Sequence, residues 1–234
     1  MIETILAFKF QLLLGILPGL VWLFFFLQED PDREPAKMIA AVFLTGGTFA
    51  VLTLLIQIPL HEMLVASGIF TLNPISITIM AALEELFKFL AAYAVIHHSK
   101  SFDVPTDAMI YMITAALGFA TLENIGAITL RPGFTGNIDA ALEAATFRFA
   151  GATLLHALGA GIIGYHWAKG IIGGGIGRKI LWGLVLATVL HTVFNIFILT
   201  YGKLLYGVIV VLIGGIFVLK DFSILNKFKI NIRG

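Results

Sequence analysis

The sequence predicts an all-α fold, a polytopic membrane bundle of about seven transmembrane helices. Hydrophobic residues make up 59% of the chain and its mean hydropathy is +0.98, whereas soluble domains are roughly 45–50% apolar. The apolar runs follow one another from residue 4 to residue 220 with short connections. Because lipid offers no hydrogen-bond partners to a backbone, each run should be helical.

Seven stretches are long enough to cross the hydrocarbon, which takes roughly 20 apolar residues. Nothing in the composition calls for a second domain, so we expect one membrane domain over residues 1–234. The first run lacks a basic start and a small-x-small cleavage site, so it should be retained as a span. The expected spans are about 4–28, 38–60, 74–97, 105–130, 140–168, 179–200 and 203–220.

The basic residues predict the orientation, because cytoplasmic loops are enriched in Lys and Arg. One face would carry only Arg131 and Lys203, with Lys9 nearby inside the first span. We therefore expect the N-terminus outside and the C-terminus in the cytoplasm, with residues 222–230 lying on the anionic inner surface. Ten basic residues fall on the other face: Arg33, Lys37, Lys100, Lys169, Arg178, Lys179, Lys220, Lys227, Lys229 and Arg233.

Charge and cysteine usage exclude several classes of function. The formal net charge is +1, which argues against nucleic acid as a partner. The chain contains no Cys, so disulfides, thiol catalysis and cysteine metal sites are excluded. Any chemistry must therefore come from carboxylates, imidazoles, amides and hydroxyls.

Three charges lie within five residues of the third expected span, at Glu84, Glu85 and Lys88. A charge at mid-bilayer costs about 3 kcal/mol, so such residues are functional by default. At 100° per residue, Lys88 falls at 40°, between Glu84 at 0° and Glu85 at 100°. Lys88 can neutralise either acid, but both acids cannot face one cavity. One glutamate should do chemistry and the other should hold the lysine.

The next three spans also carry polar or charged groups that are unfavourable in hydrocarbon. Glu123 lies in the fourth span, His156 in the fifth, and His191 and Asn195 on one face of the sixth. With the two neighbouring glutamates they can converge in one water-filled cavity between mid-membrane and the outer half. Acids and imidazoles around trapped water serve general acid–base hydrolysis, and the same set could hold a metal.

Each of these residues also has a structural explanation. The charges of the third span can form an ion-pair cluster that only fixes helix packing. Asn195 can make an interhelical hydrogen bond. Arg148 is expected to be a counter-ion for Glu123 or Glu143.

Taken together, the motifs resemble those of the PrsW-type intramembrane proteases, over essentially the whole chain. The charged, proline-containing connection from Glu29 to Pro35 is also similar to that family's first loop. The family is related to the CAAX prenyl protease and bacteriocin-processing membrane enzymes, in which a histidine stands at the position of Glu123. The similar motifs are Glu84-Glu85-x-x-Lys88, Phe119-x-x-x-Glu123, His156, and His191-x-x-x-Asn195.

The resemblance implies an intramembrane endopeptidase in the cell membrane. Its substrate would be a membrane-anchored protein, such as an anti-sigma factor, cut near the outer side of the bilayer. Glu84 would be the general base that takes a proton from the attacking water. Glu85 and Lys88 would form the supporting pair.

The resemblance also implies roles for the other four residues. Glu123 would help hold the water or shuttle its proton. His191 and Asn195 would donate hydrogen bonds to the oxyanion. His156 would protonate the leaving amine or orient Glu123.

We favour a metal-free reaction, because the chain has no His-Glu-x-x-His helix and three glutamates make an oxygen-rich zinc set. The resemblance leaves the question open, since such enzymes are described both as metalloproteases and as glutamate-type proteases. If zinc is used, its ligands should be Glu84, Glu123, His156 and His191.

Two other functions fit the same residues. A proton-coupled transporter or cation channel also uses a buried Glu/His relay, but the sequence shows no internal repeat and no paired interrupted helices. A non-catalytic membrane scaffold would keep the polar cluster only for helix specificity.

Overall fold

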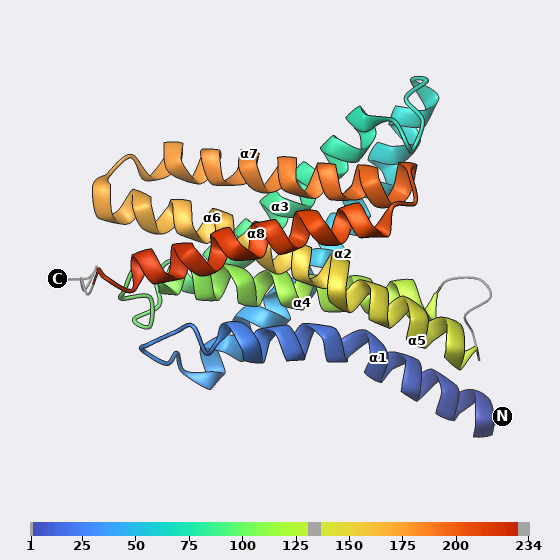
Figure 1. The fold of residues 1–234 in the computed structure, drawn as a ribbon, viewed down its shortest axis with the longest axis horizontal. Coiled ribbons are helices and arrows are strands. Elements are labelled where there is room, and N and C mark those ends of the chain that lie inside the picture. The colour runs from blue at the N-terminus through green and yellow to red at the C-terminus, as the bar shows by residue number, and fades with distance from the viewer. Residues whose placement is uncertain (1, 131–136, 229–234) are drawn as a thin grey trace.

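The computed structural model describes residues 2–130 and 137–228, and within them the chain is helical, with no strand (Figure 1). This confirms the expected all-α class. The helices are α1 (Ile2–Phe26), α2 (Ala36–Ala66), α3 (Pro74–Ile96), α4 (Asp107–Thr129), α5 (Ile138–Phe147), η1 (Arg148–Thr153), α6 (Leu154–Gly173), α7 (Ile176–Asn195), η2 (Ile196–Thr200) and α8 (Leu204–Leu225).

Six helical stretches in the described part of the chain are long and apolar enough to span a membrane. The π-helical segment η1 joins α5 and α6 into one of them, Ile138–Gly173, and η2 extends α7 to Thr200. The third helix, α3, has 23 residues but carries the three charges expected within it. These helices follow the order of the spans expected from the sequence.

The connections gather at two opposite ends of the bundle. Figure 1 shows the start of α1, the α2–α3 hairpin and the α7–α8 turn at one end, and the end of α8 at the other. The alternation matches the two faces used to count basic residues. Of those residues, Arg131, Lys229 and Arg233 lie outside the described parts of the chain.

Two boundaries differ from expectation. Helix α2 continues to Ala66 and takes up Pro59 in its interior, which membrane helices tolerate because neighbours satisfy the freed backbone groups. Helix α8 continues to Leu225, and Phe222 is fully buried against the ring of Phe26. The start of the stretch expected on the membrane surface is therefore part of the packed bundle.

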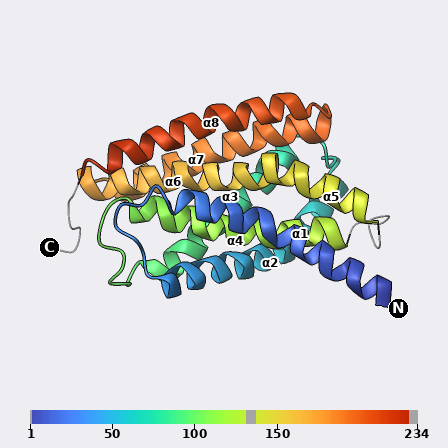
Figure 2. The same ribbon diagram turned by 60° about the horizontal axis from the view of Figure 1, so that its bottom comes forward.

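Helix α4 is the centre of the bundle and is buried along most of its length. It packs against α1, α2, α3 and α6, and Figure 2 shows it lying between α2 on one side and α6 on the other. A helix this enclosed can carry Asn124, which is fully buried, because protein, not lipid, surrounds it. Glu123, the preceding residue, is partly exposed.

Glycines set the closest helix approach. A Cβ at Gly46 of α2 would overlap the carbonyl oxygen of Ala115, and a Cβ at Gly118 of α4 would overlap that of Phe43. The two backbones therefore touch at this crossing, as small residues allow in membrane helices. It fixes the distance between α2 and α4 beside the polar cluster.

Candidate active site

Glu85 and Lys88 form a fully buried ion pair on α3. Lys88 Nζ donates to Glu85 Oε1 at 2.7 Å, and the two side chains are 0% and 1% exposed. The ammonium also lies 5.3 Å from the centre of the Phe119 ring, a favourable cation–π contact. The structure thus assigns the lysine to Glu85, one of the two arrangements that the helical angles allowed.

Glu84 points away from this pair and meets α2. Its Oε1 accepts a hydrogen bond of 3.1 Å from Gln57 Nε2, which also donates to the carbonyl oxygen of Met80 at 3.3 Å. The Glu84 side chain is 14% exposed, whereas Glu85 is sealed. Only the first glutamate is accessible to a reactant.

His191 of α7 lies between the two glutamates. Its Nδ1 is 2.7 Å from Glu85 Oε1, and its Nε2 is 3.6 Å from Glu84 Oε2. Because Glu85 accepts from Lys88 as a carboxylate, it also accepts the Nδ1 proton of His191. In the neutral form of the imidazole, the Nε2 atom that faces Glu84 then carries a lone pair.

His156 is held in the same way by a second carboxylate. Its Nε2 is 2.9 Å from Glu123 Oε2, and Arg148 Nη2 is 3.5 Å from that oxygen. Asn124 accepts a hydrogen bond from Arg148 Nε and donates to the Thr153 hydroxyl at 2.9 Å. Arg148 is therefore the counter-ion of Glu123, and the π-helical turn that it begins leads the chain to His156.

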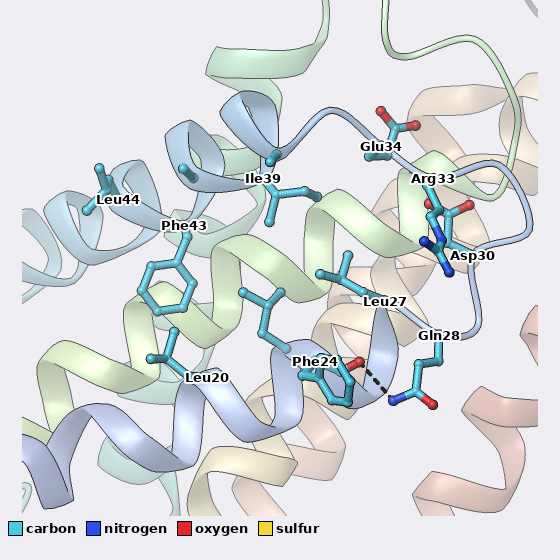
Figure 3. Close-up of a pocket in the computed structure, with 13 residues that line it drawn as sticks. Leu20, Phe24, Leu27, Gln28, Asp30, Arg33, Glu34, Ile39, Phe43 and Leu44 are labelled. Atoms are coloured by element: carbon cyan, nitrogen blue, oxygen red, sulfur yellow. Dashed lines mark hydrogen bonds between the residues drawn. The ribbon is translucent and has the colours of Figure 1, made fainter.

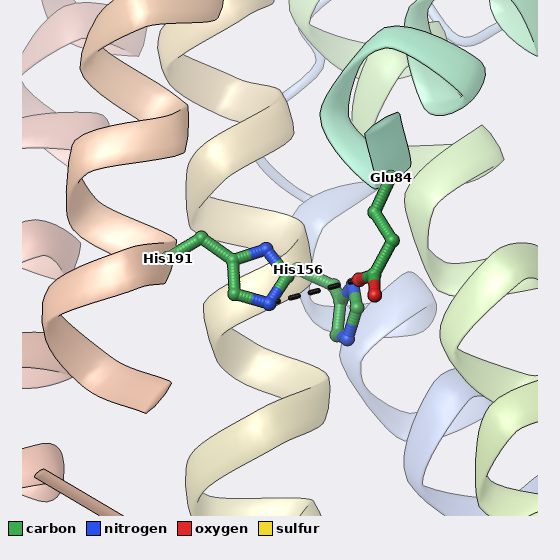
Figure 4. A group of neighbouring side chains, drawn as sticks. All are labelled: Glu84, His156 and His191. Atoms are coloured by element: carbon green, nitrogen blue, oxygen red, sulfur yellow. Dashed lines mark ion pairs between the residues drawn. The ribbon is translucent and has the colours of Figure 1, made fainter. Parts of the chain in front are cut away.

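His156 also belongs to a convergent group of three residues. Its Nδ1 is buried and has no hydrogen-bond partner among the described residues. Glu84, His156 and His191 each offer one ligand atom, and these atoms all lie within 4.8 Å of one another (Figure 4). Glu123, expected as a fourth zinc ligand, stands outside this group of three.

Two cavities adjoin these polar residues, one at Glu84 and the other at Glu123. A cavity of about 430 Å³ between α2, α3 and α7 is lined by Glu84 and Asn195. A second cavity of about 570 Å³ between α2 and α4 is mostly apolar and is lined by Glu123. Gln57 lines both cavities, so it separates the approaches to the two acids.

The structure brings six of the seven expected site residues together in two hydrogen-bonded or ion-paired groups. Glu84, Glu85, Lys88 and His191 form one group, and Glu123 and His156 form the other. The two groups meet at the rings of His156 and His191, whose centres lie 5.2 Å apart. Asn195 is the exception, since its side chain lines the Glu84 cavity without a hydrogen bond to any described residue. Gln57 was missed by sequence reasoning. The available signal was an amide within an otherwise apolar span, where a polar group needs a partner.

Comparison with known proteins gives the family. A family model described as PrsW family intramembrane metalloprotease matches residues 34–219. The chain belongs to the PrsW family. This confirms the resemblance inferred from the motifs, and with six candidate spans it identifies a multi-pass protein of the cell membrane.

Curated PrsW proteins are similar to the chain over much of its length. Protease PrsW of Geobacillus kaustophilus is 29% identical over 184 residues, which are 77% of this chain and 76% of the relative. That of Clostridioides difficile is 28% identical over 187 residues, 78% and 76% of the two chains. That of Bacillus subtilis is 33% identical over 112 residues, 47% and 50% of the two chains. No solved structure matches.

The description of the PrsW family includes a metal, and the three convergent donors fit one. One carboxylate and two imidazoles are a common catalytic zinc set. Metal-bound histidines usually donate their other ring nitrogen to a carboxylate. Here Glu85 takes that place for His191, and Glu123 takes it for His156.

Proposed function

We propose that this PrsW-family chain is an intramembrane endopeptidase that cuts a membrane-anchored protein substrate, such as an anti-sigma factor, near the outer side of the bilayer. One observation carries the proposal: Glu84 and two carboxylate-oriented imidazoles converge beside a cavity. An accessible acid beside fixed imidazoles suits the activation of water for peptide hydrolysis.

We place the hydrolytic water to one side of Glu84 Oε2 and His191 Nε2, which lie 3.6 Å apart, so that it contacts both atoms. The Nε2 lone pair would accept one hydrogen of the water, and Glu84 would take the other as a proton. The water oxygen then forms a bond to the scissile carbonyl carbon. When the C–N bond breaks, the proton passes from Glu84 to the leaving nitrogen, so Glu84 returns to its carboxylate form.

Asn195 is our candidate for stabilising the oxyanion. Its amide makes no hydrogen bond to the described residues and lines the same cavity as Glu84. One such donor contributes about 3–4 kcal/mol in well-studied hydrolases. His191 donates its Nδ1 proton to Glu85, so we assign it to orienting the water, in place of the oxyanion role implied by the resemblance.

The proposed reaction needs no metal, since Glu84 and His191 can engage both hydrogens of the water. A zinc ion would be held by Glu84, His156 and His191. When bound, it would polarise the scissile carbonyl and lower the pKa of its water. In either case His156 is oriented by Glu123 through a contact of 2.9 Å.

The two cavities suggest separate routes for substrate and water. The cavity between α2 and α4 has an apolar lining and one acid, Glu123, which is 30% exposed. It suits an unwound segment of a membrane-anchored substrate. The Glu84 cavity extends to His61, Glu62 and Thr71 at the α2–α3 hairpin, and this polar rim suits the entry of water from the outer face.

The test compares wild type with Glu84→Gln, and with Glu143→Gln as a control at an exposed acid of α5. Each is purified, checked for its thermal transition, and reconstituted with a single-span substrate; cleavage and proton flux are then measured together. We expect Glu84→Gln to lose about a hundred- to ten-thousandfold in cleavage rate, without flux in any sample. Wild-type cleavage by this variant would remove Glu84 as the base, and flux without cleavage would select the transporter.

A further inference from the structure

Helices α1 and α2 enclose a groove at the end of the bundle where the chain ends. Both helices pack along α4 but make few contacts with each other. The space between them is about 870 Å³ and lies beside the loop that joins the two helices (Figure 3). It is separate from the cluster around Glu84.

The walls of this groove are apolar and exposed. Phe24 of α1 is 71% exposed, and Leu44 of α2 is 69% exposed. Leu20, Leu27 and Ile39 continue the lining. In a membrane-spanning chain such a surface is covered by hydrocarbon, and the bilayer supplies hydrocarbon as acyl chains.

The loop end of the groove is charged. Arg33 lines it and makes no hydrogen bond or ion pair with the described residues. Asp30 also lines it and is 7% exposed; its Oδ1 accepts from the backbone N–H of Asp32, while its Oδ2 has no partner. Glu34 accepts a hydrogen bond from the Tyr111 hydroxyl.

A single guanidinium beside two carboxyl groups favours a particular kind of headgroup. The guanidinium of Arg33 can bind a phosphate. As carboxylates, the side chains of Asp30 and Glu34 can bind an ammonium, whereas they would repel a purely anionic headgroup. A quaternary ammonium has no N–H to donate, so a primary amine suits these oxygens better.

We propose that the groove binds one aminophospholipid, phosphatidylethanolamine. An acyl chain lies between α1 and α2, the phosphate binds Arg33, and the ammonium donates to Asp30 and Glu34. The site is independent of the proposed proteolysis. Its lipid would come from the leaflet at the C-terminal end of the bundle.

The experiment measures lipid retention by native mass spectrometry. Purified full-length chain is mixed with phosphatidylethanolamine, phosphatidylcholine or phosphatidylglycerol of identical acyl chains. We expect phosphatidylethanolamine to bind about tenfold more tightly than the other two. Arg33→Gln should weaken it about tenfold, whereas Lys37→Gln, which removes the same charge at an exposed residue that does not line the groove, should have no effect.

A second pair of variants tests the acyl site. Ala40 lines the groove and is exposed, so Ala40→Phe should fill the groove and abolish preferential retention without changing a charge. Leu55→Phe, at a 63% exposed position further along α2, is the control. Equal retention of the three lipids, a preference for phosphatidylglycerol, or identical behaviour of Arg33→Gln and Lys37→Gln would each overturn the proposal.

Discussion

His191 Nδ1 and Glu85 Oε1 lie 2.7 Å apart, and Lys88 donates to that same oxygen over an equal distance. The second glutamate is therefore the connection between an ammonium and an imidazole. It fixes the ring of His191 so that the other nitrogen faces Glu84. Of the two neighbouring acids, Glu85 is buried and orients His191, whereas Glu84 is accessible.

Substitution of Glu85 should affect the stability of the protein more than the chemistry of the site. Glu85→Gln leaves the Lys88 ammonium buried without its counter-ion, which costs about 3–5 kcal/mol. The measurement is the free energy of unfolding in detergent. The double variant Glu85→Gln/Lys88→Met removes both charges and should recover much of the loss. Equal stability of the single variant and wild type would contradict the ion pair.

Gln57 should act on the reaction rather than on the fold. Gln57→Leu removes the 3.1 Å hydrogen bond to Glu84, so we expect a loss of about tenfold or more in kcat/KM. The thermal transition should change little. Gln28→Leu, at the far end of the bundle, is the matched control and should keep wild-type activity. Unchanged turnover by Gln57→Leu would show that Glu84 needs no partner on α2.

Metal removal tests the nature of the reaction. We expect cleavage to continue in the presence of a chelator, with metal content far below one ion per chain, because Glu84 and His191 suffice to hold the water. The readouts are the cleavage rate and elemental analysis of the same sample. Activity that is lost on chelation and restored by zinc would instead make Glu84, His156 and His191 the ligands, and His156→Gln would then lose zinc.

The loop between α1 and α2 should make stability depend on pH. Burial raises the pKa of Glu34 above its ordinary value, and the negative charges of Asp30 and Asp103 raise it further. Hydrogen bonds from Tyr111 and Asp107 lower the pKa but do not offset this increase. Folding therefore favours the protonated form. The stability that this protonation of Glu34 contributes is complete below the pKa of the unfolded state and is lost as pH rises through the pKa of the folded state. Thermal scans should show Tm falling with rising pH, more shallowly in Glu34→Gln.

Orientation can be tested because the chain has no Cys. Single cysteines at the exposed residues Ser67 and Lys100 report on the two ends of the bundle. With the N-terminus outside, an impermeant maleimide added to intact cells should label Ser67→Cys and spare Lys100→Cys. Permeabilised cells serve as the control. The reverse pattern would place the C-terminus outside.

The order of the spans and the set of polar residues within them were predictable from the sequence. Charged residues are unfavourable in hydrocarbon, so those inside apolar runs stand out. The angular positions on α3 showed that the two glutamates must diverge. They did not show which one takes Lys88, since an angle of 40° leaves both options open. That choice depends on His191, which lies 106 residues away in sequence from Glu85 and contacts it only in the folded bundle.

The roles of the histidines also needed the folded chain. Glu85 engages the Nδ1 atom of His191 and Glu123 engages the Nε2 atom of His156, so these two acids decide which ring nitrogen is left for other contacts. The end of α2 at Ala66 was missed because the polar residues His61 and Glu62 follow the apolar run, so the expected span stopped at residue 60. The helix continues through these residues, which line the cavity beside Glu84.

The charges of α3 also bear on how the protein is made. Glu84, Glu85 and Lys88 each oppose partitioning into lipid, and one partner of both glutamates, His191, belongs to a segment translated long afterwards. We expect α3 to remain in the translocon, or beside an insertase, until the second half of the chain emerges. In ribosome-bound chains truncated before α7, alkaline extraction should therefore remove α3 from the membrane.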